Sequence, residues 1–331
     1  MLNSNKKTMN NPAGAISIKP NERGVRSVVF RALGSSCKIN FIQPDEQAAL
    51  KFLAEALSWL ETFEKKYSRF NPKSEVSQIN AAAGIEWVKV DHHMEHILDL
   101  INDLHRMSEG ILDPTTLPLM KVWDWKTVHT EIPNKEVVDA ALMLTGWKKV
   151  QRKPGAIFLP HKGMGIDFGG FGKEFAVDHL IRIAHQNGIA DVLVDLGQDL
   201  FALGGNGLHP FWHVGIQDGR HKDKYLGGLA VSGFAVSSSG DYERRFEHDG
   251  VRYGHIIDPR TGWPVSNGMC SVTALAPSCL QAGVLSTTVF VLGREEGIAF
   301  ATRAQDVEAC IQDDRGTEKT PGFIDKQVQA A

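Results

Sequence analysis

The sequence predicts a single large domain of the α+β class, with mixed sheets and flanking helices. Helical periodicities and short apolar runs occur along the chain without the strict strand–helix alternation of a doubly wound sheet. No linker rich in Pro, Gly or Ser, no charge run and no internal repeat divides the chain. Its 331 residues, 42% of them hydrophobic, are enough to build a sizeable core.

Polar segments at both ends are expected to lie outside the folded unit. Residues 1–24 are polar and rich in Asn and Lys, and residues 313–331 are also polar. We therefore expect a flexible N-terminal tail over 1–24, one folded domain over 25–312 and a loose C-terminal tail over 313–331.

The first half of this domain is predicted to be mainly helical. Residues 28–42 are expected to form a strand that is interrupted by the Leu-Gly-Ser-Ser stretch at 33–36. Further helices are expected at about 92–107 and 135–144. Two helices are marked by apolar residues at helical spacing, namely Leu50, Leu53, Leu57 and Leu60 in one and Val177, Leu180, Ile181 and Ala184 in the other.

Strands are expected to dominate the second half, because short apolar runs there are separated by Gly turns. The runs are residues 192–196, 201–203, 213–216, 229–236, 256–257 and 271–275. Two helices, at about 280–292 and 294–303, precede a last strand at 307–311.

Charge argues against nucleic acid as a partner, and hydropathy argues against a transmembrane helix. The formal net charge is −3, so the chain lacks the excess of cations that long phosphate backbones require, and no nucleic acid is expected. No run approaches 18 consecutive apolar residues, which excludes a transmembrane helix. The N-terminus has no apolar leader, so the protein is expected to be cytoplasmic, or periplasmic if a leader has been removed.

Neither the cysteines nor the histidines predict a metal site of their own. His93 and His96 lie one helical turn apart, but no further ligand stands at a useful spacing, which favours a polar helix surface. The cysteines match no zinc ribbon or redox pair and are expected to be buried, reduced thiols. They are Cys37, Cys270, Cys279 and Cys310.

A glycine-rich segment at residues 165–173 leads directly into the helix marked by Val177. It reads Gly-Ile-Asp-Phe-Gly-Gly-Phe-Gly-Lys. Glycines before a helix let the backbone approach a ligand closely, and the free amides and helix dipole favour phosphate. Lys173 adds a cation, and Asp167 can accept a hydrogen bond from a ribose or a base. The alternative is a purely structural turn between a strand and a helix.

Two familiar phosphate loops are excluded by this segment. A Walker loop requires Gly at position 167 and Ser or Thr at position 174, where the chain has Asp167 and Glu174. A dinucleotide fingerprint requires a last Gly where the chain has Phe175.

Three other segments have the composition of ligand-binding loops. His255 stands just before an Asp-Pro-Arg-Thr-Gly turn, where an imidazole can act as an acid or base or bind phosphate. Residues 110–118 form a loop made rigid by two prolines, with a carboxylate and hydroxyls. Residues 68–75 place an aromatic ring and polar groups after a helix, where they could border a flat ring. Each segment taken alone is equally consistent with a structural loop.

Together and in order, these segments resemble the FAD:protein FMN transferase family, also called ApbE-like flavin transferases. The likeness spans about residues 28–312, nearly the whole expected folded unit. The matching segments are residues 33–35, 68–80, 110–118, 167–178, 195–199, 238–242, 255–264 and 285–293.

The resemblance implies an α+β fold of the flavin-transferase type, with FAD as substrate and Mg²⁺ as the assisting ion. The hydroxyl of a threonine or serine in an acceptor protein would attack the FMN-side phosphorus, and AMP would leave. Such phosphoryl transfer needs positioning and neutralised oxygens. By family likeness, His255 takes the acceptor's proton or steadies the transferring phosphate. The residues that would contact FAD are Leu33, Phe70, Ile111, Leu112, Asp113, Asp167, Lys173 and Ile257.

The chain departs from the family at the expected metal site. The family carries Ala-Asp-Ala-Leu-(Ala/Ser)-Thr at the start of the late helix, where Asp and Thr share one helix face and hold the metal. Thr287 is present here, but Gly283 stands in the Asp position. Magnesium is usually held by one or two carboxylates plus substrate phosphates. The remaining candidate ligands are Thr287, a carbonyl near Gly170 and the FAD phosphates.

Gly283 leaves several alternatives open. The chain is a transferase in which water or another carboxylate, such as Asp241 or Asp199, replaces the missing ligand, or it is a weak transferase that needs high magnesium. It is otherwise an FAD-binding relative that has lost the chemistry. An FAD pyrophosphatase, which releases AMP and FMN without an acceptor, is a further alternative.

Overall fold

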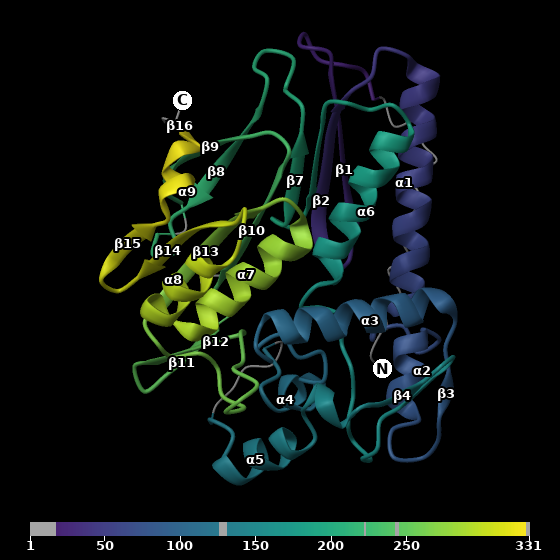
Figure 1. Cartoon of the computed structure of the whole chain (residues 1–331), viewed down its shortest axis with the longest axis vertical. Helices are drawn as coiled ribbons and strands as arrows, with labels where there is room; N and C mark the ends of the chain where they lie inside the picture. Colours follow the sequence, from purple (N-terminus) through teal and green to yellow (C-terminus); the bar gives the residue numbers. More distant parts are fainter. Residues whose placement is uncertain (1–17, 126–130, 222, 242–244, 329–331) are drawn as a thin grey trace, which may run out of the picture.

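The structure has the predicted α+β architecture (Figure 1). It is a computed structural model that describes residues 18–125, 131–221, 223–241 and 245–328. Its centre is an eight-stranded sheet with the strand order β1-β2-β6-β7-β10-β13-β14-β15. The strands are β1 (Val25–Ala32), β2 (Ser35–Ile42), β6 (Val192–Leu196), β7 (Leu200–Leu203), β10 (Phe234–Gly240), β13 (Met269–Ala276), β14 (Glu308–Asp313) and β15 (Gly316–Lys319).

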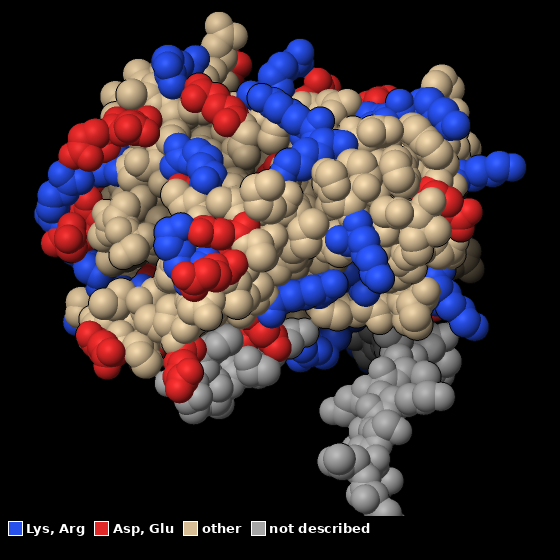
Figure 2. Space-filling model, turned by 90° about the horizontal axis from the view of Figure 1, so that it is seen from below, with Lys and Arg blue, Asp and Glu red and all other residues tan. Residues whose placement is uncertain are grey.

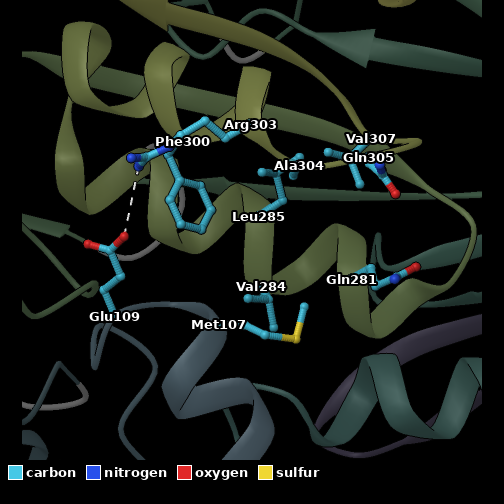
Figure 3. Close-up of a pocket in the computed structure, with 10 residues that line it drawn as sticks. All are labelled: Met107, Glu109, Gln281, Val284, Leu285, Phe300, Arg303, Ala304, Gln305 and Val307. Atoms are coloured by element: carbon cyan, nitrogen blue, oxygen red, sulfur yellow. Dashed lines mark ion pairs between the residues drawn. The ribbon is translucent and has the colours of Figure 1, made fainter.

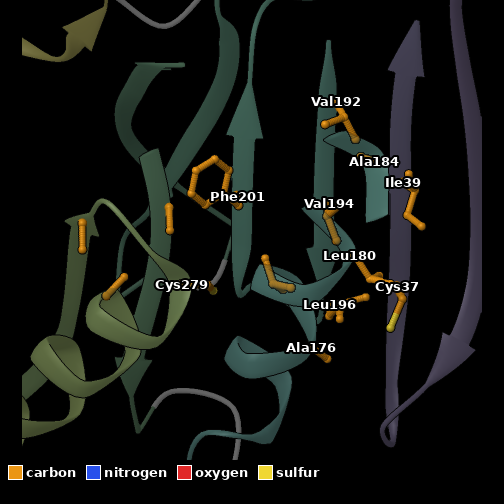
Figure 4. Packing of buried hydrophobic residues seen from close by; sticks show 14 of the residues in the cluster. Cys37, Ile39, Ala176, Leu180, Ala184, Val192, Val194, Leu196, Phe201 and Cys279 are labelled. Atoms are coloured by element: carbon orange, nitrogen blue, oxygen red, sulfur yellow. The ribbon is translucent and has the colours of Figure 1, made fainter. Parts of the chain in front are cut away.

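Four helices cover this sheet and enclose the main hydrophobic core. They are α1 (Glu46–Tyr67), α6 (Gly172–Gln186), α7 (Cys279–Leu292) and α8 (Arg294–Arg303). Figure 4 shows Ala176, Leu180 and Ala184 of α6 beside the side chains of β2 and β6, among them Ile39 and Val194. Full burial of a large aliphatic side chain such as Leu180 contributes about 1.5–3 kcal/mol, so the apolar faces of these helices fix them on the sheet.

A second lobe lies at one end of the sheet and is mainly helical (Figure 1). Its separate core contains Met94, Leu98 and Ile101, and Leu112 and Val284 join the same core. Because Val284 belongs to α7, the lobe packs directly against that helix. The lobe comprises α2 (Glu75–Ala81), α3 (His92–Met107), α4 (Leu117–Val122), α5 (Lys135–Met143), a 3-10 turn at Trp147–Lys149 and a small sheet of β3 (Val88–Lys89), β5 (Ala156–Phe158) and β4 (Gln151–Lys153).

The C-terminal segment is folded, so the expected loose tail over 313–331 is wrong for the residues described there. Asp313 ends β14, β15 pairs with β14, and β16 (Gln327–Val328) pairs with β9 (Tyr225–Val231), which also pairs with β8 (Trp212–Gln217). Between them, α9 (Pro321–Asp325) buries Phe323 completely. These polar strands are held by pairing, β15 in a hairpin with β14 and β16 with the distant strand β9, which the local composition does not reveal.

The expected N-terminal tail is also shorter than predicted. Residues 1–17 lie outside the described part of the chain, but Ile18 is buried and its carbonyl accepts a hydrogen bond of 2.8 Å from Nη1 of Arg26. This contact attaches residues 18–24 to the first strand.

Most predicted elements are present, with differences at apolar runs that turns divide. The helices expected at 92–107 and 294–303 match α3 and α8, and residues 28–42 form the β1–β2 hairpin. The run at 229–236 is split by a turn at Gly233 into β9 and β10. Residues 256–257 form no strand, and Ile257 makes a single bridge to Pro264. Leu50 is 48% exposed because the buried stripe of α1 follows Ala49, Phe52 and Ala56 instead.

The cysteines have the state that the sequence predicts. All four cysteines are buried free thiols. In the ranges that the structure describes, no helix is both long and apolar enough to cross a membrane. On the face shown in Figure 2, cationic and anionic side chains are interspersed among neutral ones.

Candidate functional site

The glycine-rich segment meets two other predicted segments at the junction between the sheet and the second lobe. The amide of Asp167 donates a hydrogen bond of 2.8 Å to the carbonyl of Pro114 in the rigid loop. Asn80, at the end of the 68–80 segment, exchanges two hydrogen bonds with the backbone of Ile166, of 2.9 and 2.7 Å. Segments separated by up to 98 residues, as Arg69 and Asp167 are, therefore come together here.

Asp167 is oriented by a cation that the sequence analysis did not single out. Nε of Arg69 donates to Oδ2 of Asp167 at 2.8 Å, and the amide of Gly169 donates to Oδ1 at 3.1 Å. The same guanidinium lies 4.1 Å from the ring centre of Phe70. The Phe70 side chain is 66% exposed, so an aromatic face is presented at the rim of the junction.

The carboxylate of Asp113 is directed into the protein. Its Oδ1 accepts from the amide of Thr115 at 2.8 Å, and its Oδ2 accepts from the amide of Trp147 at 2.8 Å. The neighbouring Ile111 and Leu112 are buried. Asp113 therefore shapes the 110–118 loop, and its charge is already satisfied by internal donors.

The β1–β2 hairpin turn joins the junction from the other side. Leu33, with a φ of 51°, packs against both hydrophobic cores. Ser35 lies against Gly197, since a Cβ on residue 197 would stand 2.7 Å from Cβ of Ser35 and 3.8 Å from Cδ of Lys173. The 33–35 and 195–199 segments therefore both border Lys173.

Lys173 stands in the first turn of α6 and is held by an ion pair. Its ammonium contacts Oδ2 of Asp199, whose Oδ1 accepts from Oγ of Ser237 at 2.5 Å. Burial alone would lower the pKa of Lys173, but the carboxylates of Asp199 and Glu174 raise this pKa above its ordinary value. The ammonium is therefore charged across the physiological range, next to the amides of the helix start.

Glu174, the next residue, occupies the space beside Gly283. A Cβ on residue 283 would lie 2.7 Å from both Cγ and Oε1 of Glu174. Glu174 is only 7% exposed, and its Oε2 has no hydrogen-bond partner among the residues described. Burial, reinforced by the charge of Asp199, raises the pKa of Glu174 to about 8. Any residue with a Cβ at position 283 would therefore force the Glu174 side chain to move.

The contact between Glu174 and Gly283 is fixed by a cap that joins the two helices. Asp178, one turn further along α6, accepts hydrogen bonds from the amides of Cys279 and Leu280, of 2.7 and 3.1 Å. These amides belong to the first turn of α7, where a carboxylate is favourable. The cap therefore sets the register of α7 against α6.

Thr287 lies one helical turn after Gly283, on the same face of α7. Its hydroxyl is 3.0 Å from Oγ of Ser239, which is also 2.9 Å from Oγ of Ser286. Ser237 and Ser239 share one face of β10, because side chains alternate along a strand. Tyr242, in the matching segment that follows, lies outside the described residues.

The donor set around Gly283 fits a hard divalent cation. It offers a buried carboxylate oxygen that lacks a partner and a threonine hydroxyl, and oxygen ligands of this kind suit magnesium. Within the described ranges, no group of three or more His, Cys, Asp or Glu could hold a metal ion. An ion here would therefore need carbonyl or substrate oxygens as well. Of the two carboxylates expected as replacements, Asp199 pairs with Lys173 and Asp241 lies 3.5 Å from Nη1 of Arg252.

His255 and Ile257 occupy the loop after β12 (Val251–Gly254), which pairs with β11 (Arg245–His248). His255 is half-buried, and the next residue packs against the main core. Ile257 packs against a small cluster that includes Trp123. The structure therefore anchors this loop on both sides of His255.

A cavity of about 420 Å³ opens on another flank of α7 (Figure 3). Arg303 of α8 and Glu109 bridge it, with 3.8 Å between Nη2 and Oε1. None of the residues predicted to contact FAD lines it. Its lining is Met107, Glu109, Gln281, Val284, Leu285, Phe300, Arg303, Ala304, Gln305 and Val307.

Comparisons with known proteins show similarity over most of the chain. The model of the ApbE family matches residues 33–311. The FAD:protein FMN transferase of Treponema pallidum (strain Nichols) is 30% identical over 313 residues, which cover 89% of this chain and 86% of that protein. The protein of the same name from Klebsiella pneumoniae (strain 342) is 30% identical over 286 residues, 81% of each chain.

Solved structures show the same fold. The crystal structure of the ApbE protein from Thermotoga maritima MSB8 superimposes with a TM-score of 0.83 at 27% identity, over 92% of this chain and 100% of that one. The apo form of the flavinyl transferase ApbE from Pseudomonas stutzeri gives a TM-score of 0.81 at 26% identity, over 91% and 96% of the two chains.

Proposed function

Because the chain belongs to the ApbE family, a family of flavin transferases, we propose that it transfers FMN from FAD to a threonine or serine hydroxyl of an acceptor protein. The observation that carries this proposal is the convergence of four other matching segments on residues 166–173. The 33–35 and 195–199 segments border Lys173, and the 68–80 and 110–118 segments contact Ile166 and Asp167. Amides and a cation at a helix start form a site for a diphosphate.

FAD would be held by the rim and floor of the junction. The exposed ring of Phe70 would stack on the flavin, and Asp167, oriented by Arg69, would accept a hydrogen bond from it. Lys173 would share its charge between Asp199 and the diphosphate. The other proposed contacts are Leu33, Ile111, Leu112, Asp113 and Ile257, with Asp113 acting through the loop it shapes.

The transfer step forms one bond and breaks one. The acceptor's hydroxyl oxygen bonds to the FMN-side phosphorus, and the bond from that phosphorus to the bridging oxygen of the diphosphate breaks. AMP leaves with the bridging oxygen. We assign His255 as the group that takes the hydroxyl proton, because an imidazole is the side chain best suited to proton transfer near neutral pH.

Magnesium is the ion that the proposal requires. When bound, it would neutralise charge on the diphosphate oxygens during transfer. The hydroxyl of Thr287 and the carbonyl of Gly170 are proposed as two of its ligands, together with substrate oxygens. Thr287 is oriented by Ser239, which supports its place at the site.

One experiment distinguishes this function from its two alternatives. The purified chain is incubated with FAD and a set of peptides that carry Thr or Ser in varied contexts, with and without Mg²⁺. We expect AMP and covalently flavinylated peptide to form in equal amounts, and only with the metal. FAD retained without any AMP would identify a binding protein. AMP with free FMN and no modified peptide would identify a pyrophosphatase.

A further inference from the structure

We propose that Glu174 supplies the metal-binding carboxylate that residue 283 lacks, so that the ligand has moved from α7 to the facing position on α6. This inference rests on the proposed function, in which a divalent cation binds beside Thr287. It concerns how this chain completes the site despite Gly283.

The first support is the position of the carboxyl group. Oε1 of Glu174 lies 2.7 Å from the place that a Cβ of residue 283 would occupy. Residues four apart on a helix face lie about 5–6 Å apart at their Cβ atoms. The carboxyl of Glu174 therefore approaches the face of α7 that carries Thr287, from the neighbouring helix.

The second support is an unused acceptor. Glu174 is buried, and its Oε2 finds no hydrogen-bond donor in the described part of the chain. Burying a carboxyl oxygen without a partner is costly, and such groups are retained where a ligand completes them. Lys173 does not fill this role, because its ammonium pairs with Asp199.

The third support is that the two positions are mutually dependent. An Asp at position 283 would place its Cβ inside the van der Waals contact distance of Glu174, so Glu174 could not keep its observed position beside an Asp at position 283. The alternative explanation is that Glu174 only fills the space beside Gly283, a role that would not need its charge. The isosteric variant Glu174→Gln separates these explanations.

The test measures binding of Mn²⁺, used as the probe for a divalent cation, by its paramagnetic resonance signal in the presence of FAD and without an acceptor. Glu174→Gln keeps the shape and should weaken Mn²⁺ affinity by at least about tenfold. Its affinity for FAD without metal should stay within about twofold of the wild type, since the amide replaces the carboxylate without a change of volume.

Two further variants test the exchange directly. Gly283→Asp alone should lower the thermal midpoint, because the new Cβ collides with Glu174. Glu174→Ala/Gly283→Asp removes the collision and returns a carboxylate to α7. This double variant should bind Mn²⁺ more tightly than Glu174→Ala, and a double-mutant cycle should show strong coupling between the positions.

Asp218→Asn is the control, because Asp218 is a buried carboxylate outside α6 and α7 that pairs with Arg220 and His221. It should lower stability while Mn²⁺ affinity remains that of the wild type. Unchanged affinity in Glu174→Gln, or no gain of the double variant over Glu174→Ala, would overturn the inference. Should Glu174→Gln not fold, the double variant decides.

The outcome is separable from that of the proposed function. A wild type that flavinylates peptides, together with full Mn²⁺ affinity in Glu174→Gln, would refute only the role of Glu174. A wild type that forms no AMP at any Mg²⁺ concentration would refute the transferase, and the Mn²⁺ measurements would still decide whether Glu174 binds the ion.

Discussion

Lys173 and Asp199 form an ion pair between the first turn of α6 and the residue that precedes β7. The pair fixes a cation at the end of the glycine-rich segment, and Ser237 holds the carboxylate through its other oxygen. Asp199 is almost completely buried, whereas the Lys173 side chain is 27% exposed. The pair therefore supports the fold at Asp199 and presents charge to the junction at Lys173.

Asp199→Asn should destabilise the protein by about 3 kcal/mol, because it leaves a largely buried ammonium without its counter-charge. Urea denaturation at pH 7 measures the change in the free energy of unfolding. Asp139→Asn is the control, since it breaks the exposed pair with Lys135 and should cost no more than about 0.5 kcal/mol. Equal losses in both variants would contradict the structural role of Asp199.

Phe323→Ala should destabilise the C-terminal segment by about 3–5 kcal/mol, because the ring is fully buried in the cluster beneath β9 and β14. Its neighbour Ile324 is 55% exposed, so Ile324→Ala should have almost no effect. Hydrogen exchange of the amides of β15 and β16, measured together with urea denaturation, locates the loss. Similar behaviour of the two variants would restore the interpretation of this segment as a tail.

The sequence predicted the elements whose pattern is local. Periodic apolar residues identified α1 and α6, and the order of the short motifs identified the family and hence the fold. The segment 313–328 was missed because β15 and β16 are short and polar. β15 is held by its hairpin with β14, and β16 by pairing with the distant strand β9. A single buried aromatic residue, Phe323, was the available signal.

The candidate site was predicted as a set of segments but not as a set of contacts. Gly283 was identified as the departure from the family, whereas Glu174 was considered only as a mismatch to a phosphate loop. Nothing local connects two residues 109 positions apart in the chain. Arg69 was likewise not singled out within its segment, because its partner Asp167 lies 98 residues away in the chain. Packing between helices supplies what the pattern lacks.

Asp313 should make the stability depend on pH in acid. Hydrogen bonds from Arg294, together with those from Arg315, hold the pKa of Asp313 well below its ordinary value. A carboxylate with a lowered pKa in the folded state stabilises the protein above the unfolded value of about 3.9, and this contribution is lost as the pH falls below it. The free energy of unfolding of Asp313→Asn should therefore differ most from that of the wild type between pH 5 and 7, which lies above the unfolded-state pKa.

Urea denaturation from about pH 3 to pH 7 tests this dependence, with the gap between wild type and Asp313→Asn narrowing below about pH 4. Arg294→Met removes the main hydrogen-bond donor to Asp313. Its free energy of unfolding should therefore be close to that of Asp313→Asn over the whole pH range. A gap that widened on acidification would mean that Asp313 does not titrate as the contacts indicate.

Gly197→Ala should impair both folding and FAD binding. Residue 197 has a φ of +75°, which costs an L-residue about 1–2 kcal/mol, and the new methyl would stand 2.7 Å from Ser35 beside Lys173.

Gly188→Ala is the matched control, because its φ is +69° but nothing lies within 4 Å of the new methyl. Gly188→Ala should lose only the stability that a positive φ costs an L-residue, and it should bind FAD as the wild type does. Gly197→Ala should lose more stability and also FAD affinity, measured by flavin fluorescence, because displacement of Ser35 shifts the hairpin turn and Lys173. Equal FAD affinity in both variants would show that this face of the junction does not contact the nucleotide.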